Sequence, residues 1–210
     1  MTVYTRAITP APGLPDLQRS QPARYPHLLQ SVAHGRFDIL FACPGDNLVL
    51  QQDGTLLQPD NNPAAGGDFL SALDAWWQAG DHDDTAADLP FTGGWFLYLG
   101  YELAGQIEPT LQLPYTDPLL PVAFATRVTA ALVRDRESGD VTLVAEPDGA
   151  TYLDTIVADI EALATAGNPV RQPVNALEIT EQADSIYLDA VRRIKDYIVE
   201  GDVFQVNLSR

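Results

Sequence analysis

Apolar positions in the first two thirds of the chain come in short runs that predict β-strands separated by turns. These runs occupy residues 36–42, 48–50, 55–57, 91–101, 122–133 and 141–145. Asp53-Gly54 between the second and third runs is typical of a tight hairpin turn, and the polar residues between the last two runs predict a second hairpin. Pro44-Gly45 should end the first strand. Pro10, Pro12 and Pro15 should prevent a helix near the amino terminus.

Three other segments repeat apolar residues every three or four positions, which predicts amphipathic helices. They lie at residues 69–77, 152–164 and 185–200. Asp68 can cap the first helix, Asp184 or Ser185 can cap the third, and Gly201 is placed to end the third. Residues 203–209 then alternate strictly between apolar and polar, which predicts a strand with one buried face.

These elements together predict an α+β fold, in which a mainly antiparallel, sandwich-like sheet packs against helices. We expect a first domain at residues 1–167 and a linker at 168–177, where prolines interrupt any periodic pattern. Residues 178–210 would form the first helix and strand of a second domain. A strand that ends the chain without a partner leaves unpaired backbone groups, so we expect this second domain to be incomplete.

Composition narrows the classes of function mainly by exclusion. The 210 residues include 12 Lys and Arg against 29 Asp and Glu, a formal net charge of −17. Such a charge repels nucleic acid and anionic membrane surfaces, so neither is an expected partner. Cys43 is the single cysteine and lies in an apolar run, which indicates a small buried side chain and excludes an intrachain disulfide. The sequence shows no signal peptide or membrane span, and we expect a cytoplasmic protein.

Common catalytic motifs are absent from the sequence. It contains no Gly-x-Gly-x-x-Gly, no phosphate-binding loop with lysine, no Gly-x-Ser-x-Gly and no His-Glu-x-x-His. The three histidines are scattered, and the acidic run at residues 81–84 is typical of a solvated surface. Residue chemistry alone therefore predicts a soluble acidic α+β protein without assigning a reaction.

Three segments resemble the component I family of anthranilate synthase and aminodeoxychorismate synthase. The most specific is Ile198–Ser209, with the helix that precedes it. The second is Gly93–Leu103 followed by Ile107-Glu108, although many family members have glycine where Leu97 stands. The third is Leu28-Leu29-Gln30-Ser31 followed by Arg36-Phe37-Asp38-Ile39. The resemblance spans nearly the whole chain.

The resemblance implies a chorismate-using enzyme. In aminodeoxychorismate synthase the 4-hydroxyl of chorismate is replaced by an amino group for folate synthesis. A glutamine amidotransferase subunit supplies the ammonia, and Mg2+ holds the substrate carboxylate. The family's catalytic and metal-binding residues lie downstream of the segment around Gln205, so the resemblance implies that this chain holds neither and is inactive alone.

A second implied site is a pocket for L-tryptophan. The matching positions are Ser31, His34, Gly35, Arg36 and Phe37. A hydroxyl and backbone groups would hold the amino-acid ends, and apolar walls would hold the indole. Two positions depart from this resemblance: His34-Gly35 stands where a relative has Tyr-Ser, and Gln30 stands where anthranilate synthases have Glu. The alternative is that Ser31 merely caps a turn and Phe37 belongs to the core.

Two polar residues of the last predicted strand, Gln205 and Asn207, would face the active-site region in the intact family enzyme. Their alternative is an ordinary solvent-facing side of a strand. The segment from Tyr101 to Glu108 favours aminodeoxychorismate synthase within the family. Anthranilate synthase component I, an isochorismate or salicylate synthase, and a non-catalytic module that binds tryptophan or docks a glutaminase remain as alternatives.

Overall fold

The structure is a computed structural model that describes residues 3–59, 62–65, 67–80, 89–111, 113, 119–166 and 180–209. The chain divides into two compact units, Met1–Pro169 and Val170–Arg210. All strands of the described sheet belong to the first unit, and the second unit contains one helix among its described residues. The predicted linker at 168–177 lies outside the described residues.

The first unit is built on one antiparallel sheet of eight strands, ordered β1-β8-β7-β3-β4-β5, with β2 paired to β3 and β6 paired to β7. The strands are β1 Tyr4–Ile8, β2 His27–Leu29, β3 Phe37–Leu50, β4 Thr55–Leu57, β5 Pro63–Ala65, β6 Gly94–Leu99, β7 Ala123–Asp135 and β8 Val141–Ala145. Both predicted hairpins are present, as β3–β4 and β7–β8. The predicted α+β class with an antiparallel sheet is confirmed.

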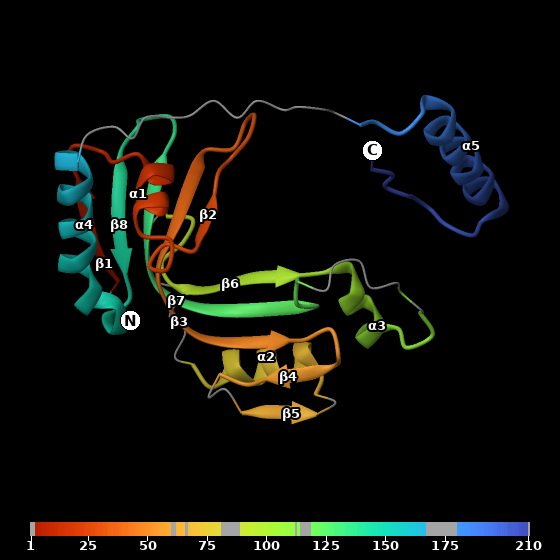
Figure 1. The fold of residues 1–210 in the computed structure, drawn as a ribbon, viewed down its shortest axis with the longest axis horizontal. Helices are drawn as coiled ribbons and strands as arrows, with labels where there is room; N and C mark the ends of the chain where they lie inside the picture. Colours follow the sequence, from red (N-terminus) through yellow and green to blue (C-terminus); the bar gives the residue numbers. More distant parts are fainter. Residues whose placement is uncertain are drawn as a thin grey trace. The chain divides into compact units, whose positions relative to one another are not determined.

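The long pair β3–β7 runs through both halves of the sheet, as Figure 1 shows. The amino-terminal half of β3 adjoins β2, and its carboxy-terminal half adjoins β4. The prediction that Pro44-Gly45 ends the strand was wrong. β3 continues past Pro44 through a register shift between Pro44 and Asn47, and Cys43 before it has φ 54°. A bulge tolerates proline because it interrupts the ladder of hydrogen bonds locally.

The described part of the first unit also contains four α-helices. They are α1 Leu14–Ser20, α2 Phe69–Gln78, α3 Ala104–Ile107 and α4 Leu153–Ala166, with 3₁₀ turns η1 Tyr101–Leu103 and η2 Pro147–Tyr152. The Asp68 carboxylate accepts from the Leu70 amide at 3.0 Å and caps α2 as predicted. The prediction of no early helix was wrong, because Pro15 occupies the first turn of α1, where its missing N–H would have no helical partner anyway.

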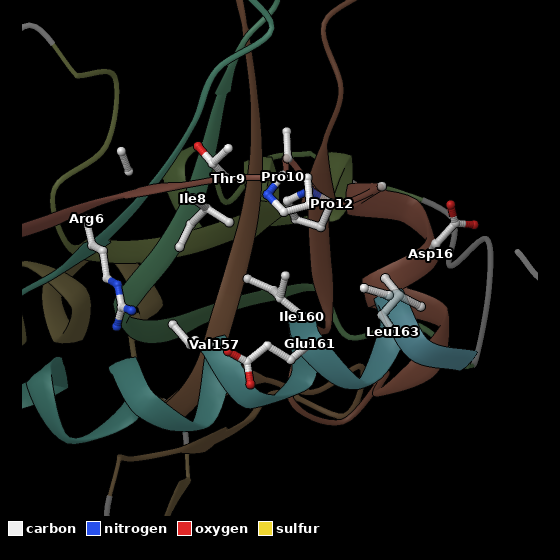
Figure 2. A pocket seen from close by; sticks show the side chains of 14 residues that line it. Arg6, Ile8, Thr9, Pro10, Pro12, Asp16, Val157, Ile160, Glu161 and Leu163 are labelled. Carbon is white, nitrogen blue, oxygen red and sulfur yellow. The ribbon is translucent and has the colours of Figure 1, made fainter. Parts of the chain in front are cut away.

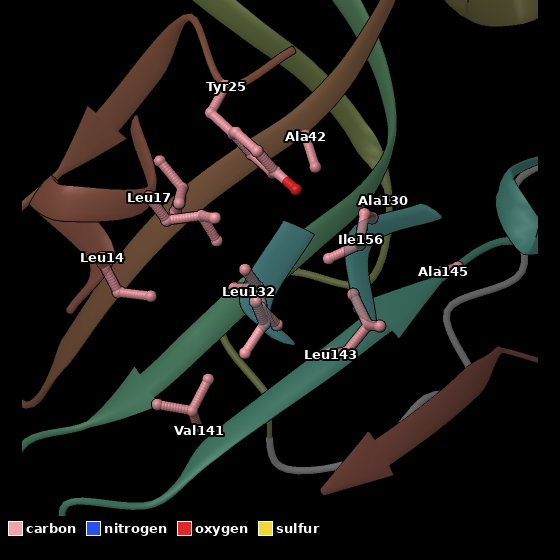
Figure 3. Packing of buried hydrophobic residues seen from close by; sticks show 12 residues of the cluster. Leu14, Leu17, Tyr25, Ala42, Ala130, Leu132, Val141, Leu143, Ala145 and Ile156 are labelled. Atoms are coloured by element: carbon pink, nitrogen blue, oxygen red, sulfur yellow. The ribbon is translucent and has the colours of Figure 1, made fainter. Parts of the chain in front are cut away.

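Two hydrophobic clusters hold the first unit together. The larger one packs α1 and α4 onto one half of the sheet, and its fully buried residues include Leu14, Leu17, Tyr25, Leu132, Leu143 and Ile156 (Figure 3). The second packs α2 onto the other half through Phe69, Leu48 and Leu56. Helices α1 and α4 thus pack on one half of the sheet, and α2 packs on the other half.

The second unit contains α5, Asp184–Glu200. Gly201 ends the helix as predicted, with φ 86° and with the Asp202 amide donating to the Tyr197 carbonyl at 3.0 Å. Asp184 is the first helical residue, and the capping position belongs to Ala183.

The predicted strand at residues 203–209 is wrong: this segment has no regular secondary structure. Within the described residues the sheet of eight strands does not include it, and the Phe204 side chain is fully exposed. A β-strand forms only when a neighbour accepts and donates its backbone hydrogen bonds.

Candidate functional site

The loop that joins β2 to β3 carries the residues predicted to bind tryptophan. We call residues 31–37, which include the first residue of β3, the β2–β3 loop. The Ser31 hydroxyl donates to the Phe37 carbonyl, and the Ser31 amide donates to Oδ1 of Asp38 at 2.9 Å. Asp38 is only 6% exposed, so this carboxylate is a buried anchor beneath the loop. Ser31 therefore closes the base of the loop, and its hydroxyl oxygen keeps its ability to accept a hydrogen bond.

Gly35 packs directly against Ser31. A Cβ added at Gly35 would run into the Cβ and Oγ of Ser31, so the close approach requires glycine. The Gly35 amide donates to the Val32 carbonyl at 3.3 Å, and Ala33 between them has φ 54°. The loop is thus a tight turn whose tip, including Val32 and His34, is exposed.

Arg36 is bound to the neighbouring strand. Its Nε and Nη2 donate to Oδ2 of Asp135 at 3.0 and 2.6 Å, and Nε lies 3.5 Å from a carboxylate oxygen of Glu137. The guanidinium also lies over the Phe37 ring, 4.8 Å from its centre. Its hydrogen bonds, together with the Glu137 amide, hold the pKa of Asp135 below its ordinary value. These contacts give Arg36 an anchoring role in the described structure.

The β7–β8 turn supplies a residue that the sequence did not nominate. Arg136 donates from Nη1 to the carbonyls of Ser31 at 2.7 Å and of Gly35 at 3.1 Å. Its own amide donates to the Arg36 carbonyl at 2.8 Å. No local motif could have revealed it, because Arg136 reaches the loop only through the pairing of β3 with β7.

An aromatic wall lies beside β2, at the start of the loop. The His27 ring stacks on Phe96 of β6, with ring centres 3.9 Å apart and planes 5° from parallel, and it also stacks on Phe124. Phe41 meets Phe96 edge-on at 5.3 Å. Burial lowers the pKa of His27 below 6.5. The His27 ring thus packs within this aromatic wall, and Leu29 two positions later extends the same face with 49% exposure.

A separate hollow of about 510 Å3 lies between α4 and the segment after β1 (Figure 2). Its apolar lining comes from Ile8, Pro10, Pro12, Val157, Ile160 and Leu163. Its charged lining comes from Arg6 and Glu161, both exposed, and from Asp16, which is paired with Arg19. The charged groups of Arg6 and Glu161 face solvent and Asp16 is paired with Arg19, so these side chains do not form a set that would orient a ligand in the hollow.

The remaining predicted site residues lie in the second unit. Gln205 and Asn207 are exposed, and their side chains bond to each other at 3.2 Å. Among the described residues no group of three or more His, Cys, Asp or Glu is arranged to hold a metal ion. No helix in the described part is long and apolar enough to span a membrane.

Comparison with known proteins fixes the family. Residues 26–210 match the family model described as chorismate binding enzyme, so the chain belongs to the chorismate-binding enzymes. It is 34% identical over 140 residues to anthranilate synthase component 1 of Arthrobacter globiformis, covering 58% of this chain and 26% of that protein. It is 26% identical over 200 residues to aminodeoxychorismate synthase component 1 of Bacillus subtilis strain 168, covering 90% and 42%.

The fold has a counterpart among solved structures. Anthranilate synthase component I from Streptococcus pneumoniae TIGR4 matches with a TM-score of 0.50 at 17% identity, covering 84% of this chain and 41% of that one. This likeness concerns the fold alone. The chain spans about a quarter to two fifths of the length of these relatives.

Proposed function

We propose that this chain forms the amino-terminal part of a component I enzyme that converts chorismate and ammonia to 4-amino-4-deoxychorismate for folate synthesis. The observation that carries the proposal is the family match over residues 26–210. The alignment along 90% of the chain with an aminodeoxychorismate synthase component supports this product. A glutamine amidotransferase subunit would supply the ammonia, and the reaction would take place in the cytoplasm.

Anthranilate formation is the second candidate, and the higher identity of 34% to the Arthrobacter protein favours it. Growth of a strain that lacks the gene distinguishes the two. We expect para-aminobenzoate to restore growth on minimal medium and tryptophan not to do so. Rescue by tryptophan alone would assign the anthranilate reaction instead, and rescue by neither would refute both.

We further propose that the 210-residue chain is catalytically inactive alone. Among the described residues no group of three or more His, Cys, Asp or Glu is arranged to hold a metal ion. By the family resemblance, the reactive groups and the Mg2+ ligands would come from the rest of the parent enzyme. Gln205 and Asn207 would contribute only to the surroundings of that active site. Incubation with chorismate, ammonium and Mg2+, followed by chromatography, should yield no aminated product. Product above the level of a chain-free control would refute this.

The β2–β3 loop, with Ser31, His34, Gly35, Arg36 and Phe37, is proposed as one wall of an L-tryptophan pocket. Two observations support it: the Ser31 hydroxyl, whose O–H donates to the Phe37 carbonyl, has an oxygen that can still accept a hydrogen bond, and Leu29 beside the loop is half exposed. Calorimetric titration of the chain with tryptophan should give saturable binding. Indole, which lacks the amino-acid group, is the control and should bind more weakly. Equal heats for both ligands would contradict recognition by the loop.

A further inference from the structure

We propose that Arg136 is the positioning residue of the β2–β3 loop. From the β7–β8 turn, its guanidinium holds the carbonyls of Ser31 and Gly35, one at each end of the loop tip. The inference rests on the proposed tryptophan function. Arg136 would set the conformation of the loop, and the loop conformation would set the affinity for the ligand. Arg136 itself touches no ligand in this proposal.

The contacts between loop and turn run in both directions. Arg136 of the turn binds two loop carbonyls, while Arg36 of the loop binds Asp135, the last residue of β7, at 2.6 and 3.0 Å. The backbone bond from the Arg136 amide to the Arg36 carbonyl lies between these two side-chain contacts. Each segment therefore contributes one arginine that binds the other, so the loop and the β7–β8 connection are linked from both sides.

Fixing the Ser31 carbonyl also fixes the peptide group that follows it. In a trans peptide the carbonyl and the next N–H point in opposite directions. Since the Ser31 carbonyl points toward Arg136, the Val32 N–H points away from the turn, at a residue that is 84% exposed. Arg136 thus presents a backbone donor on the side opposite the turn, which suits the carboxylate of an amino acid.

Without the Arg136 side chain, the Arg36 pair with Asp135 and the backbone bond to the Arg36 carbonyl would remain, but the loop tip would rest on its internal bonds. Those are the Ser31 contacts to Phe37 and Asp38 and the longer Gly35 bond to Val32. A tight turn with an exposed tip gains conformational entropy when a clamp is removed. Loosening should therefore appear first at the Gly35 and Ser31 amides.

The test compares Arg136→Gln with Arg136→Lys and the matched control Arg134→Gln. Arg134 lies two residues earlier in β7, opposite Asp38, and its side chain donates to the Pro12 carbonyl and not to a loop carbonyl. Hydrogen exchange by NMR measures the Ser31 and Gly35 amides, and calorimetry measures the tryptophan Kd. In Arg136→Gln we expect exchange to accelerate and Kd to rise, each about tenfold, as loss of a charge-assisted hydrogen bond predicts. Arg136→Lys should recover part of both, and Arg134→Gln should change neither.

The urea midpoint separates positioning from general stability, because Arg136 is exposed and its removal should leave the midpoint unchanged. Unchanged exchange at Ser31 and Gly35 in Arg136→Gln would overturn the inference, and so would equal effects of Arg134→Gln. Absence of tryptophan binding by the unmodified chain would instead refute the proposed tryptophan pocket. The exchange data would still decide whether Arg136 sets the loop shape.

Discussion

Tyr25 joins the segment before β2 to helix α4, and its hydroxyl offers a sharp test of how the first unit is held together. The side chain is fully buried, and its hydroxyl donates to Oδ2 of Asp159 at 2.8 Å. Arg24 pairs with the same carboxylate oxygen. Burial, together with the bond to Asp159, raises the pKa of Tyr25 well above its ordinary value. Tyr25→Phe removes one hydrogen bond and keeps the ring, so no cavity forms.

The expected loss follows from the charge on Asp159. A hydrogen bond to a charged group contributes about 1.5–3 kcal/mol, and the Asp159 side chain is 14% exposed, so water can replace part of it. We therefore expect Tyr25→Phe to lower the free energy of unfolding by about 1.5–2 kcal/mol. Urea unfolding followed by tryptophan fluorescence reports on this unit, because all three tryptophans of the chain lie in it.

The matched control is Tyr152→Phe, at a tyrosine that is 41% exposed and should lose less than about 0.5 kcal/mol. A double-mutant cycle with Asp159→Asn tests the assignment of the partner. In that background the loss from Tyr25→Phe should fall to about 1 kcal/mol, since the acceptor becomes neutral. Equal losses for Tyr25→Phe and Tyr152→Phe would refute the reasoning.

Two further predictions concern the sheet. Burial lowers the pKa of His27, so the unfolded chain binds a proton more readily than the folded chain, and the free energy of unfolding should fall as pH drops below about 6.5. Urea midpoints measured between about pH 7 and 5.5 should fall less in His27→Phe than in the unmodified chain. Gly93 has φ 140°, and a Cβ there would meet the Glu146 carboxylate, so Gly93→Ala should cost about 2–3 kcal/mol in urea unfolding. Gly105→Ala in α3, with open space around it, should be neutral or slightly stabilising; a similar cost in both variants would contradict this explanation.

Elements stabilised by nearby residues were predictable from sequence. Helices α2 and α4 follow from apolar spacing, and the hairpin at Gly54 follows from turn chemistry, with φ 81° at that glycine. The course of β3 past Pro44 was not predictable in this way. Its bulge exists because the residues on both sides pair with β7, a strand distant in the chain. A proline in the sequence indicates a local break in the hydrogen bonds of a strand, but whether the strand continues after it depends on pairing with a strand that is distant in sequence.

The same reasoning applies to the candidate site. Ser31 to Phe37 are contiguous, so a short sequence pattern could locate them. Their supports, Asp135 and Arg136, lie far along the chain, and the register that places Phe37 opposite Asp135 brings them together. Sequence reasoning also considered Arg36 as a ligand residue without foreseeing its pairing with Asp135. A charged residue beside a candidate pocket can be interpreted only when its nearest opposite charge is known.

The second unit shows why one prediction held and the next did not. Helix α5 forms although none of its residues is buried, because the hydrogen bonds of a helix close within the segment itself. Residues 203–209 carry an equally regular alternation, but a strand draws every one of its hydrogen bonds from a neighbour. An alternating pattern therefore predicts which side chains share a face if the segment pairs with another strand. The pattern does not provide that strand, and the Phe204 side chain is fully exposed here.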